Sequence, residues 1–189
     1  LLDLSAGLRE LCCVKEIHIV SVKNEVKEIL WLLEQGFKDK VMVKTANLNG
    51  PEIQKFIFAI DDEKLAFSNY SNPQEFLYEP NSAILKSGAF KILGDKFNMY
   101  KLHDHSHLYT NKQLLEFPGR RFKVLKTIPF NKKEIHKLEL KKANITVRNF
   151  PINVADLRKK FKIKDGGEVY LFFTTNPKGE KIVVECHKI

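Results

Sequence analysis

The chain has 189 residues, of which 43% are hydrophobic and 29% are charged, as is ordinary for a soluble globular protein. Its longest apolar runs, such as 29–33, are far shorter than the roughly eighteen residues of a membrane-spanning helix, and no secretory signal pattern opens it. The net charge of +9 is uneven: residues 119–189 carry 18 Lys and Arg against 7 Asp and Glu, whereas residues 1–118 carry 14 against 16. Such asymmetry indicates a polyanion partner, most often nucleic acid, although a lysine-rich surface that only aids solubility gives the same composition.

The first third of the chain predicts alternating strands and short helices. Residues 16–22 alternate and are rich in β-branched side chains, whereas residues 25–35 place apolar side chains at helical spacing. The predicted elements are, in order, a short helix capped by Ser5, a strand at 16–22, a helix at 25–35 between Asn24 and Gly36, an antiparallel strand pair at 40–48 and 53–60, and a short strand at 64–67 after the polar turn Asp61-Asp62-Glu63.

The remainder of the chain follows a polar, turn-rich boundary at residues 69–73. Its predicted elements are an extended segment at 76–80, a helix that Asn81 or Ser82 caps and that runs to about residue 97, an extended segment at 101–110, a strand at 119–128, a helix at 132–138, a strand at 143–150, a helix at 154–161 capped by Asn153, and strands at 168–175 and 181–187 joined by a turn at 176–179. Residues beyond 130 therefore predict a compact α+β unit.

Motifs for a self-contained enzyme are missing from the sequence. There is no G-x-G and no G-x-x-x-x-G-K-[ST], hence no glycine-rich loop of the kind that holds a dinucleotide or an adenosyl cofactor. The three cysteines have no C-x-x-C spacing, and we predict free thiols in a reducing, cytoplasmic compartment. A cysteine and a histidine brought together by the fold stay an open alternative. We therefore assign no catalytic and no cofactor-binding residue.

The densest group of metal-ligand side chains is His103, His105 and His107. On a strand these histidines would share one face, because strand side chains repeat every two residues, and together they could bind a transition metal. The simpler interpretation is a polar strand end with histidines in solvent. Apart from Asp104 within the same segment, no further carboxylate or thiolate partner is evident nearby, so we assign no metal site.

A basic segment gives the stronger functional signal. We predict ten nucleic-acid-binding residues: Arg120, Arg121, Lys123 and Lys126 on one strand, Arg148 on the next, and Arg158, Lys159, Lys160, Lys162 and Lys164 around a helix end. Cations complement the dipole at a helix C-terminus, but five in seven residues exceed what that effect requires. Such density holds phosphates without sequence preference. The interleaved aromatic residues are expected to be mostly core, with base stacking as the alternative.

Three long stretches carry a family resemblance. They are residues 16–33 (EIHIVSVKNEVKEILWLL), 78–110 (YEPNSAILKSGAFKILGDKFNMYKLHDHSHLYT) and 143–171 (ANITVRNFPINVADLRKKFKIKDGGEVYL). Together they resemble the C-terminal portion of bacterial class I S-adenosylmethionine-dependent methyltransferase-like proteins that end in a THUMP-like domain. The resemblance covers nearly the whole chain, but none of its phrases is a catalytic motif.

The resemblance implies an α+β fold, in which an incomplete Rossmann-like methyltransferase sheet edge precedes a ferredoxin-like/THUMP-like α+β module. It implies a methyltransferase remnant at 1–69, a ferredoxin-like or helical connector at 70–130 and a basic THUMP-like domain at 131–189. S-adenosylmethionine is expected only in the full-length protein, upstream of this chain. Because THUMP domains are associated with structured RNA, the resemblance implies an RNA partner and RNA methylation by the full-length protein.

Two other functions stay open, namely an adaptor whose basic face docks an acidic protein, and a parent enzyme that methylates a non-RNA substrate. The chain begins at Leu1, and Leu2-Asp3 resembles the tail of the fifth methyltransferase strand, so we expect a fragment. A sheet without its central strands exposes unpaired backbone groups. Residues 1–67 are therefore expected to form a homo-oligomer, by packing against a second copy or by swapping strands with it.

Overall fold

The chain folds as two interleaved compact units. The computed structural model describes residues 4–189, so Leu2 and Asp3, with their predicted strand end, lie outside the described residues. The first unit joins the residues up to Phe67 with Pro80–Lys96, and the second joins Ser68–Glu79 with Phe97–Ile189. The division into contiguous domains at 1–69, 70–130 and 131–189 stays a prediction.

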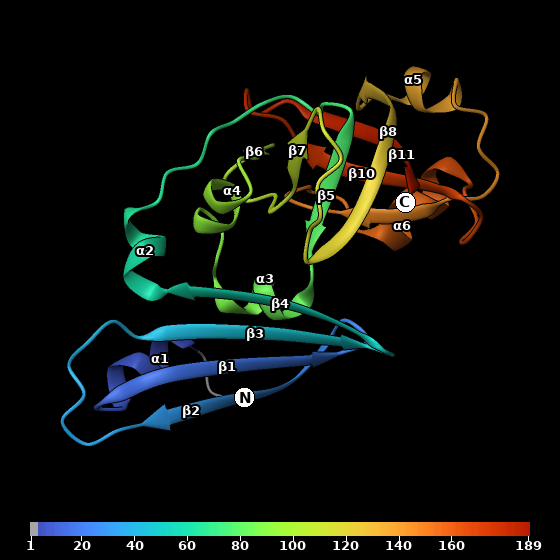
Figure 1. The fold of residues 1–189 in the computed structure, drawn as a ribbon. Helices are drawn as coiled ribbons and strands as arrows, with labels where there is room; N and C mark the ends of the chain where they lie inside the picture. The colour runs from blue at the N-terminus through green and yellow to red at the C-terminus, as the bar shows by residue number, and fades with distance from the viewer. Residues whose placement is uncertain (1–3) are drawn as a thin grey trace. The chain divides into compact units, whose positions relative to one another are not determined.

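The first unit is a four-stranded mixed sheet with short helices (Figure 1). Its elements are α1 (Leu4–Glu10), β1 (Val14–Val22), β2 (Glu25–Leu33), β3 (Met42–Asn49), β4 (Glu52–Ala59), α2 (Ile60–Leu65), α3 (Ser82–Ser87) and α4 (Ile92–Lys96). The strand order is β2-β1-β3-β4, in which β1 and β3 run parallel and the two outer pairs run antiparallel. Helix α3 contacts the first three strands, and alternate residues of β1, Ile17 and Ile19, are fully buried.

The predicted helix at 25–35 is wrong, because residues 25–33 form the strand β2. Lys23 and Asn24 both have positive φ, at 50° and 63°, as the two central residues of a tight hairpin turn often do. The turn sends β2 back antiparallel to β1. The apolar residues of this segment fit both the helical repeat and the two-residue repeat of a strand. Ile29 and Trp31 lie two positions apart and pair with Ile19 and Ile17 of β1. The hairpin turn therefore determines that this segment is a strand and not a helix.

Three other local predictions in this unit need correction. Ser5 lies inside α1 and does not precede it. The acidic turn predicted at 61–63 and the strand predicted at 64–67 are also wrong, because residues 61–65 belong to α2 and residues 66–67 follow it without forming a strand. The three acidic residues lie in the first turn of α2, where negative charge is stabilised by the helix dipole. The single helix predicted from Ser82 to about residue 97 is divided, because Gly88 adopts φ 76° after α3 and the chain restarts as α4.

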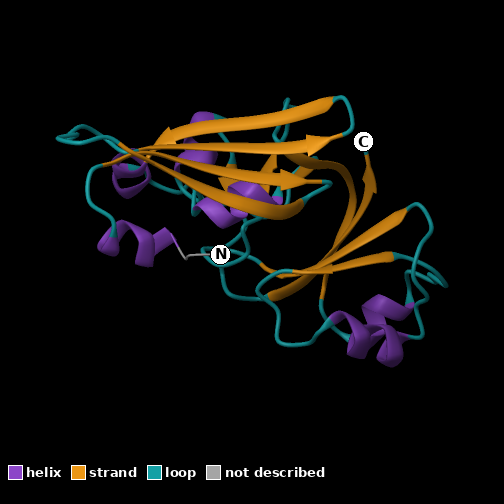
Figure 2. Ribbon diagram, turned by 90° about the horizontal axis from the view of Figure 1, so that it is seen from below, coloured by secondary structure: helices purple, strands orange, loops and turns teal. Residues whose placement is uncertain are grey.

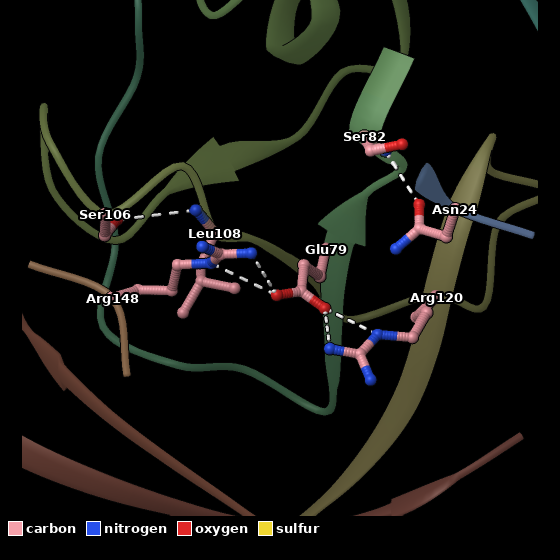
Figure 3. Close-up of polar contacts among 7 residues, drawn as sticks. All are labelled: Asn24, Glu79, Ser82, Ser106, Leu108, Arg120 and Arg148. Carbon is pink, nitrogen blue, oxygen red and sulfur yellow. Dashed lines mark hydrogen bonds and ion pairs between the residues drawn. The ribbon is translucent and has the colours of Figure 1, made fainter. Parts of the chain in front are cut away.

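Side-chain amides fix the start of α3 in the first unit. Of the two predicted caps, Asn81 and Ser82, the structure selects Asn81, which accepts a hydrogen bond from the backbone N–H of Ile84 at 3.1 Å. Asn81 also donates to Gln54 at 3.3 Å. The Oδ1 atom of Asn24 accepts from the backbone N–H of Ser82 at 2.7 Å (Figure 3). The β1–β2 turn is therefore joined to the helix N-terminus.

The second unit is built on a seven-stranded sheet. Its elements are β5 (Phe76–Pro80), β6 (Tyr100–Lys101), β7 (Tyr109–Asn111), β8 (Gly119–Pro129), α5 (Lys132–His136), β9 (Asn144–Val147), α6 (Val154–Phe161), β10 (Val169–Thr175) and β11 (Lys181–Lys188). The strand order is β6-β7-β5-β8-β11-β10-β9, and β9 runs parallel to β10. One apolar cluster, around Phe173 and Val183, packs with α5 and α6, whereas a second cluster contains Leu77, Phe122 and Phe172. Strands dominate both units (Figure 2).

The C-terminal elements confirm the sequence predictions most closely. Helix α6 has the predicted bounds, and Asn153 caps it by accepting from the backbone N–H of Asp156 at 2.9 Å. Strands β10 and β11 form the predicted antiparallel hairpin. The extended segment predicted at 101–110 is wrong, because only its two ends are strands and the histidines lie in the loop between them.

The fold as a whole is mixed α+β, as predicted. No helix within residues 4–189 is both long and apolar enough to cross a membrane.

Candidate functional site

A buried carboxylate lies near the end of β5. Glu79 is on the same side of the strand as Leu77, because strand side chains alternate, and only 3% of its side chain is exposed. Leu77 itself belongs to the apolar cluster with Phe122. Within residues 4–189, Glu79 is the one acidic residue that is buried. A carboxylate in such surroundings requires charged or hydrogen-bonding partners, because removing an ion from water is costly.

Two arginines distant in sequence supply those partners. Arg120, on β8, donates from Nε to Oε2 of Glu79 at 2.6 Å and adds an ion pair through Nη2. Arg148, just after β9, donates to Oε1 from Nε at 3.1 Å and from Nη2 at 2.8 Å. Figure 3 shows the guanidinium groups reaching the carboxylate from opposite sides. We call Glu79, Arg120 and Arg148 the Glu79 triad.

The Glu79 triad carries a net charge of +1, because two guanidinium groups share one carboxylate. The arginine side chains are 37% and 35% exposed, whereas the carboxylate between them is almost fully covered. The guanidinium carbon of Arg120 also lies 5.6 Å from the centre of the Phe122 ring, which is a cation–π distance. The solvent-facing part of the triad is therefore cationic.

The three histidines lie in the loop between β6 and β7, so the expectation that they share a strand face is wrong. His103 Nδ1 lies 3.0 Å from Nδ2 of Asn149, the residue after Arg148. His107 is half-buried, and burial, reinforced by the charges of Lys101 and Arg148, lowers its pKa to about 4. His107 is thus neutral at physiological pH. Within residues 4–189 no group of three or more His, Cys, Asp or Glu side chains is arranged to hold a metal ion.

Three more of the ten predicted residues form ion pairs at the surface. Arg121 donates to Glu116 at 2.7 Å, and Lys123 donates to Glu75 at 2.9 Å. Arg158 pairs with Asp165 and donates to the backbone carbonyls of Ala143 and Ile163 at 3.1 and 3.4 Å, so it fixes the chain around α6. These cations are already engaged by the protein, which the sequence could not indicate.

The other five predicted residues are exposed lysines. Lys126 is on β8, whereas Lys159, Lys160, Lys162 and Lys164 follow one another at the C-terminal end of α6 and just beyond it. Within residues 4–189 none of the five forms an ion pair, although the Nζ atom of Lys160 lies 5.6 Å from the ring centres of Phe130 and Phe161. The positive charge of these lysines is therefore available to a ligand.

The structure adds two lysines that the sequence prediction missed. A parallel bridge joins Lys142 to Lys164, and the backbone N–H of Lys164 donates to the carbonyl of Lys141 at 2.9 Å. Both added lysines are exposed. We define the lysine cluster as Lys141, Lys142, Lys159, Lys160, Lys162 and Lys164. The sequence shows that residues 141 and 142 are adjacent lysines, but only the fold shows that they lie close to residue 164.

The thiols and aromatic residues offer little further chemistry. All three cysteines are free, as predicted, and burial raises the pKa of Cys186, which makes it a poor nucleophile. Phe122 and Phe172 are fully buried, as expected for core residues. Phe150 is partly buried and lines a hollow of about 440 Å³ with Asn149 and Lys181.

Comparison with known proteins identifies two domain types. A family model described as THUMP domain-like matches residues 119–188, and a ferredoxin-like domain model matches residues 76–118. The chain is also similar to a solved structure from Porphyromonas gingivalis W83, provisionally described as a methyltransferase, with a TM-score of 0.92 and 35% identity. That match covers 98% of this chain and 48% of the other, so the chain spans about half the length of the Porphyromonas gingivalis protein. A search of the curated proteins finds no match.

These similarities support a THUMP-like, methyltransferase-related protein with ferredoxin-like and THUMP-like domains. All ten predicted contact residues fall inside the THUMP domain-like match. Glu79 falls inside the ferredoxin-like match, so the Glu79 triad joins the two matched segments.

Proposed function

We propose that this chain is the RNA-engaging, non-catalytic part of an S-adenosylmethionine-dependent RNA methyltransferase, and that the lysine cluster holds RNA phosphates. The observation that carries the proposal is the lysine cluster itself. Its six exposed side chains form no ion pair within residues 4–189, and all six lie inside the THUMP domain-like match. THUMP-like domains are generally associated with RNA, which supports RNA over other polyanions.

The chemistry of the lysine cluster suits phosphate binding without sequence readout. A lysine ammonium group is a point charge on a flexible stem, so it can follow a phosphate but does not fix its orientation. Each phosphate that is neutralised releases condensed counterions, and log affinity falls linearly with log salt by about 0.7 to 0.9 per contact. The cluster would hold structured RNA in place while chemistry occurs elsewhere in the longer protein.

The residues described here do not fit a site for the cofactor. The one adjacent pair of glycines with positive φ, Gly166 and Gly167, precedes strand β10, whereas a glycine-rich cofactor loop follows a strand and opens a helix. We therefore assign S-adenosylmethionine and catalysis to the longer protein, whose Porphyromonas gingivalis relative is about twice as long as this chain. The free cysteines favour a cytoplasmic location.

For the first unit we propose the edge of a Rossmann-like methyltransferase sheet. The parallel β1–β3 pair supports this assignment, although the connection between the two strands is a strand, β2, where a crossover helix is usual.

We also propose self-association through the first unit, because Leu30 and Leu32 on the edge strand β2 are 51% and 47% exposed. Sedimentation velocity should show a dimer that Leu30→Lys dissociates, and a strictly monomeric wild-type chain would contradict self-association.

The test of RNA binding compares two variants with equal charge change. The cluster variant is Lys159→Gln/Lys160→Gln/Lys162→Gln/Lys164→Gln, and the control is Lys23→Gln/Lys38→Gln/Lys55→Gln/Lys91→Gln, which neutralises four exposed lysines of the first unit. Binding to a fluorescent structured RNA is measured over a salt series. The cluster variant should lose roughly 3 units of salt slope and more than tenfold in affinity, whereas the control should change little.

Two results would contradict RNA binding by the lysine cluster. Equal losses in both variants would mean that only total charge matters. Equal affinity of the wild-type chain for RNA and for heparin, with no difference between the variants, would favour a basic face that docks an acidic protein.

A further inference from the structure

We propose that the Glu79 triad is a second phosphate site, in which Glu79 positions Arg120 and Arg148 to bind a phosphoryl group of the RNA. This inference rests on the proposed RNA function and deepens it. The lysine cluster supplies charge, whereas the Glu79 triad supplies a fixed arrangement of hydrogen-bond donors. The ligand chemistry is a phosphate oxygen, which either a backbone phosphodiester or a terminal phosphate of the RNA provides.

The first argument is the number of unused donors. A guanidinium group has five N–H bonds, and both arginines contact Glu79 through the same edge, formed by Nε and Nη2. Within residues 4–189, the Nη1 atoms of Arg120 and Arg148 make no hydrogen bond or ion pair. Each arginine therefore keeps an edge with donors for a second anion.

The second argument is the balance of charge and exposure. One carboxylate neutralises one of the two guanidinium groups, so the triad keeps a charge of +1. About a third of each arginine side chain reaches solvent, while 3% of Glu79 does. An approaching anion thus meets the arginines and is shielded from the carboxylate.

The third argument is a contrast with the other arginine ion pairs. Glu116, the partner of Arg121, is 96% exposed, and Asp165, the partner of Arg158, is 79% exposed. In those pairs an incoming phosphate would compete with, and be repelled by, an exposed carboxylate. The Glu79 triad places its carboxylate behind the arginines, where it orients them without blocking access.

The fourth argument is preorganisation. Two-point contact with Glu79 holds each guanidinium plane, and Phe122 packs against Arg120 at 5.6 Å. Planar guanidinium groups suit bidentate binding of phosphate, and fixing them before binding reduces the entropy lost when the ligand is bound. Glu79 is accordingly a positioning residue and does not itself touch the ligand.

The sharpest test keeps charge constant and changes geometry. Arg120→Lys and Arg148→Lys retain the positive charge but lose the planar fork, and Arg121→Lys is the matched control at a surface ion pair. We expect each triad variant to lose roughly tenfold in RNA affinity, with little change in salt slope, while the control stays within about twofold. Unchanged affinity in both triad variants would overturn the phosphate site and leave the lysine cluster as the RNA-binding surface.

The variant Glu79→Gln separates positioning from charge by the sign of its effect. Removing a negative charge should tighten RNA binding if only the electrostatic field matters. If Glu79 positions the arginines, the neutral amide weakens binding even though the net charge rises. We expect weaker binding, and tighter binding would overturn the positioning role.

A measurement on the unaltered chain covers the possibility that these variants fail to fold. Inorganic phosphate is titrated into the 15N-labelled wild-type protein, and the Nε–Hε resonances of the arginines are followed by NMR. Those of Arg120 and Arg148 should shift saturably, whereas those of Arg121 and Arg158 should not. RNAs with and without a 5′-phosphate then distinguish the terminal from the backbone source. Absence of any selective shift would contradict the site, whereas selective shifts in a chain that does not bind RNA would contradict only the proposed function.

Discussion

The two cationic regions of the second unit differ in how the protein holds their charge. In the Glu79 triad, a buried carboxylate on β5 holds one arginine from β8 and another from just after β9 through hydrogen bonds of 2.6 to 3.1 Å. The lysine cluster is exposed and makes no ion pair within residues 4–189. Positively charged side chains therefore serve different purposes in the two regions: those of the Glu79 triad should contribute stability and geometry, whereas those of the lysine cluster should contribute charge alone.

The largest effect on stability should follow from Glu79→Ala. Its removal leaves two guanidinium groups without their shared partner, and breaking such a buried pair costs about 3 kcal/mol of unfolding free energy. The matched change Asp165→Ala at the exposed pair of Arg158 should cost less than about 1 kcal/mol. Urea denaturation measures both, and equal losses would remove the distinction between a buried and an exposed ion pair.

A pH dependence should be the next largest effect, and it concerns the histidine beside the triad. The pKa of His107 is lowered to about 4 in the folded chain, so the unfolded chain binds the proton more readily. Stability should therefore be lost as the pH falls from about 6.5 towards 4, by on the order of 2 kcal/mol after allowance for partial exposure. His107→Asn should flatten this part of the pH profile. An unchanged slope between pH 4 and 6.5 would assign the acid sensitivity to other groups.

A smaller effect is expected at α6, the helix that carries two of the six lysines of the lysine cluster. Asn153→Ala removes the N-cap contact to Asp156 and should lower the unfolding free energy by about 1 kcal/mol. Asn153→Ser, which keeps a capping oxygen, is the control. Since the lysines lie at the opposite end of α6, RNA affinity should hardly change. A large loss of affinity would show that the lysine cluster depends on a rigid helix.

The smallest effect on stability should come from the lysine cluster itself. The variant with Lys159, Lys160, Lys162 and Lys164 changed to Gln should differ from wild type by less than about 0.5 kcal/mol, because none of these side chains forms an ion pair within residues 4–189. Replacing the four lysines also removes the repulsion between their positive charges, which raises the unfolding free energy. A clear loss of stability in urea would mean that these lysines have structural partners.

Local signals explain which parts of the fold the sequence predicts well. Helix α6 has an asparagine cap and a clear helical period, and the β10–β11 hairpin surrounds a turn rich in Asn, Pro and Gly. Residues 25–33 carry signals for both helix and strand, and the hairpin turn at Lys23 and Asn24 selects the strand. The helix and strand propensities of these residues alone cannot determine which structure forms, because pairing with β1 is a tertiary contact.

The candidate site is less predictable for the same physical reason. The contacts of Glu79 with Arg120 and Arg148 span 41 and 69 positions in sequence. Such contacts leave no local pattern, and the one sequence signal was an acidic residue inside an otherwise apolar strand (FLYEP). The basic character of residues 119–189 was evident from composition. Which of those cations are engaged by acidic partners, and which are available to a ligand, depends on the fold.

RNA binding by the lysine cluster is the central claim, and a salt titration of the intact chain tests it most directly. Fluorescent structured RNA is titrated with wild-type protein, with the cluster variant and with the first-unit control. We predict steeply salt-dependent binding by wild type and control, with a salt slope smaller by roughly 3 in the cluster variant. Weak, salt-independent binding by wild type, or identical slopes in all three proteins, would contradict the claim.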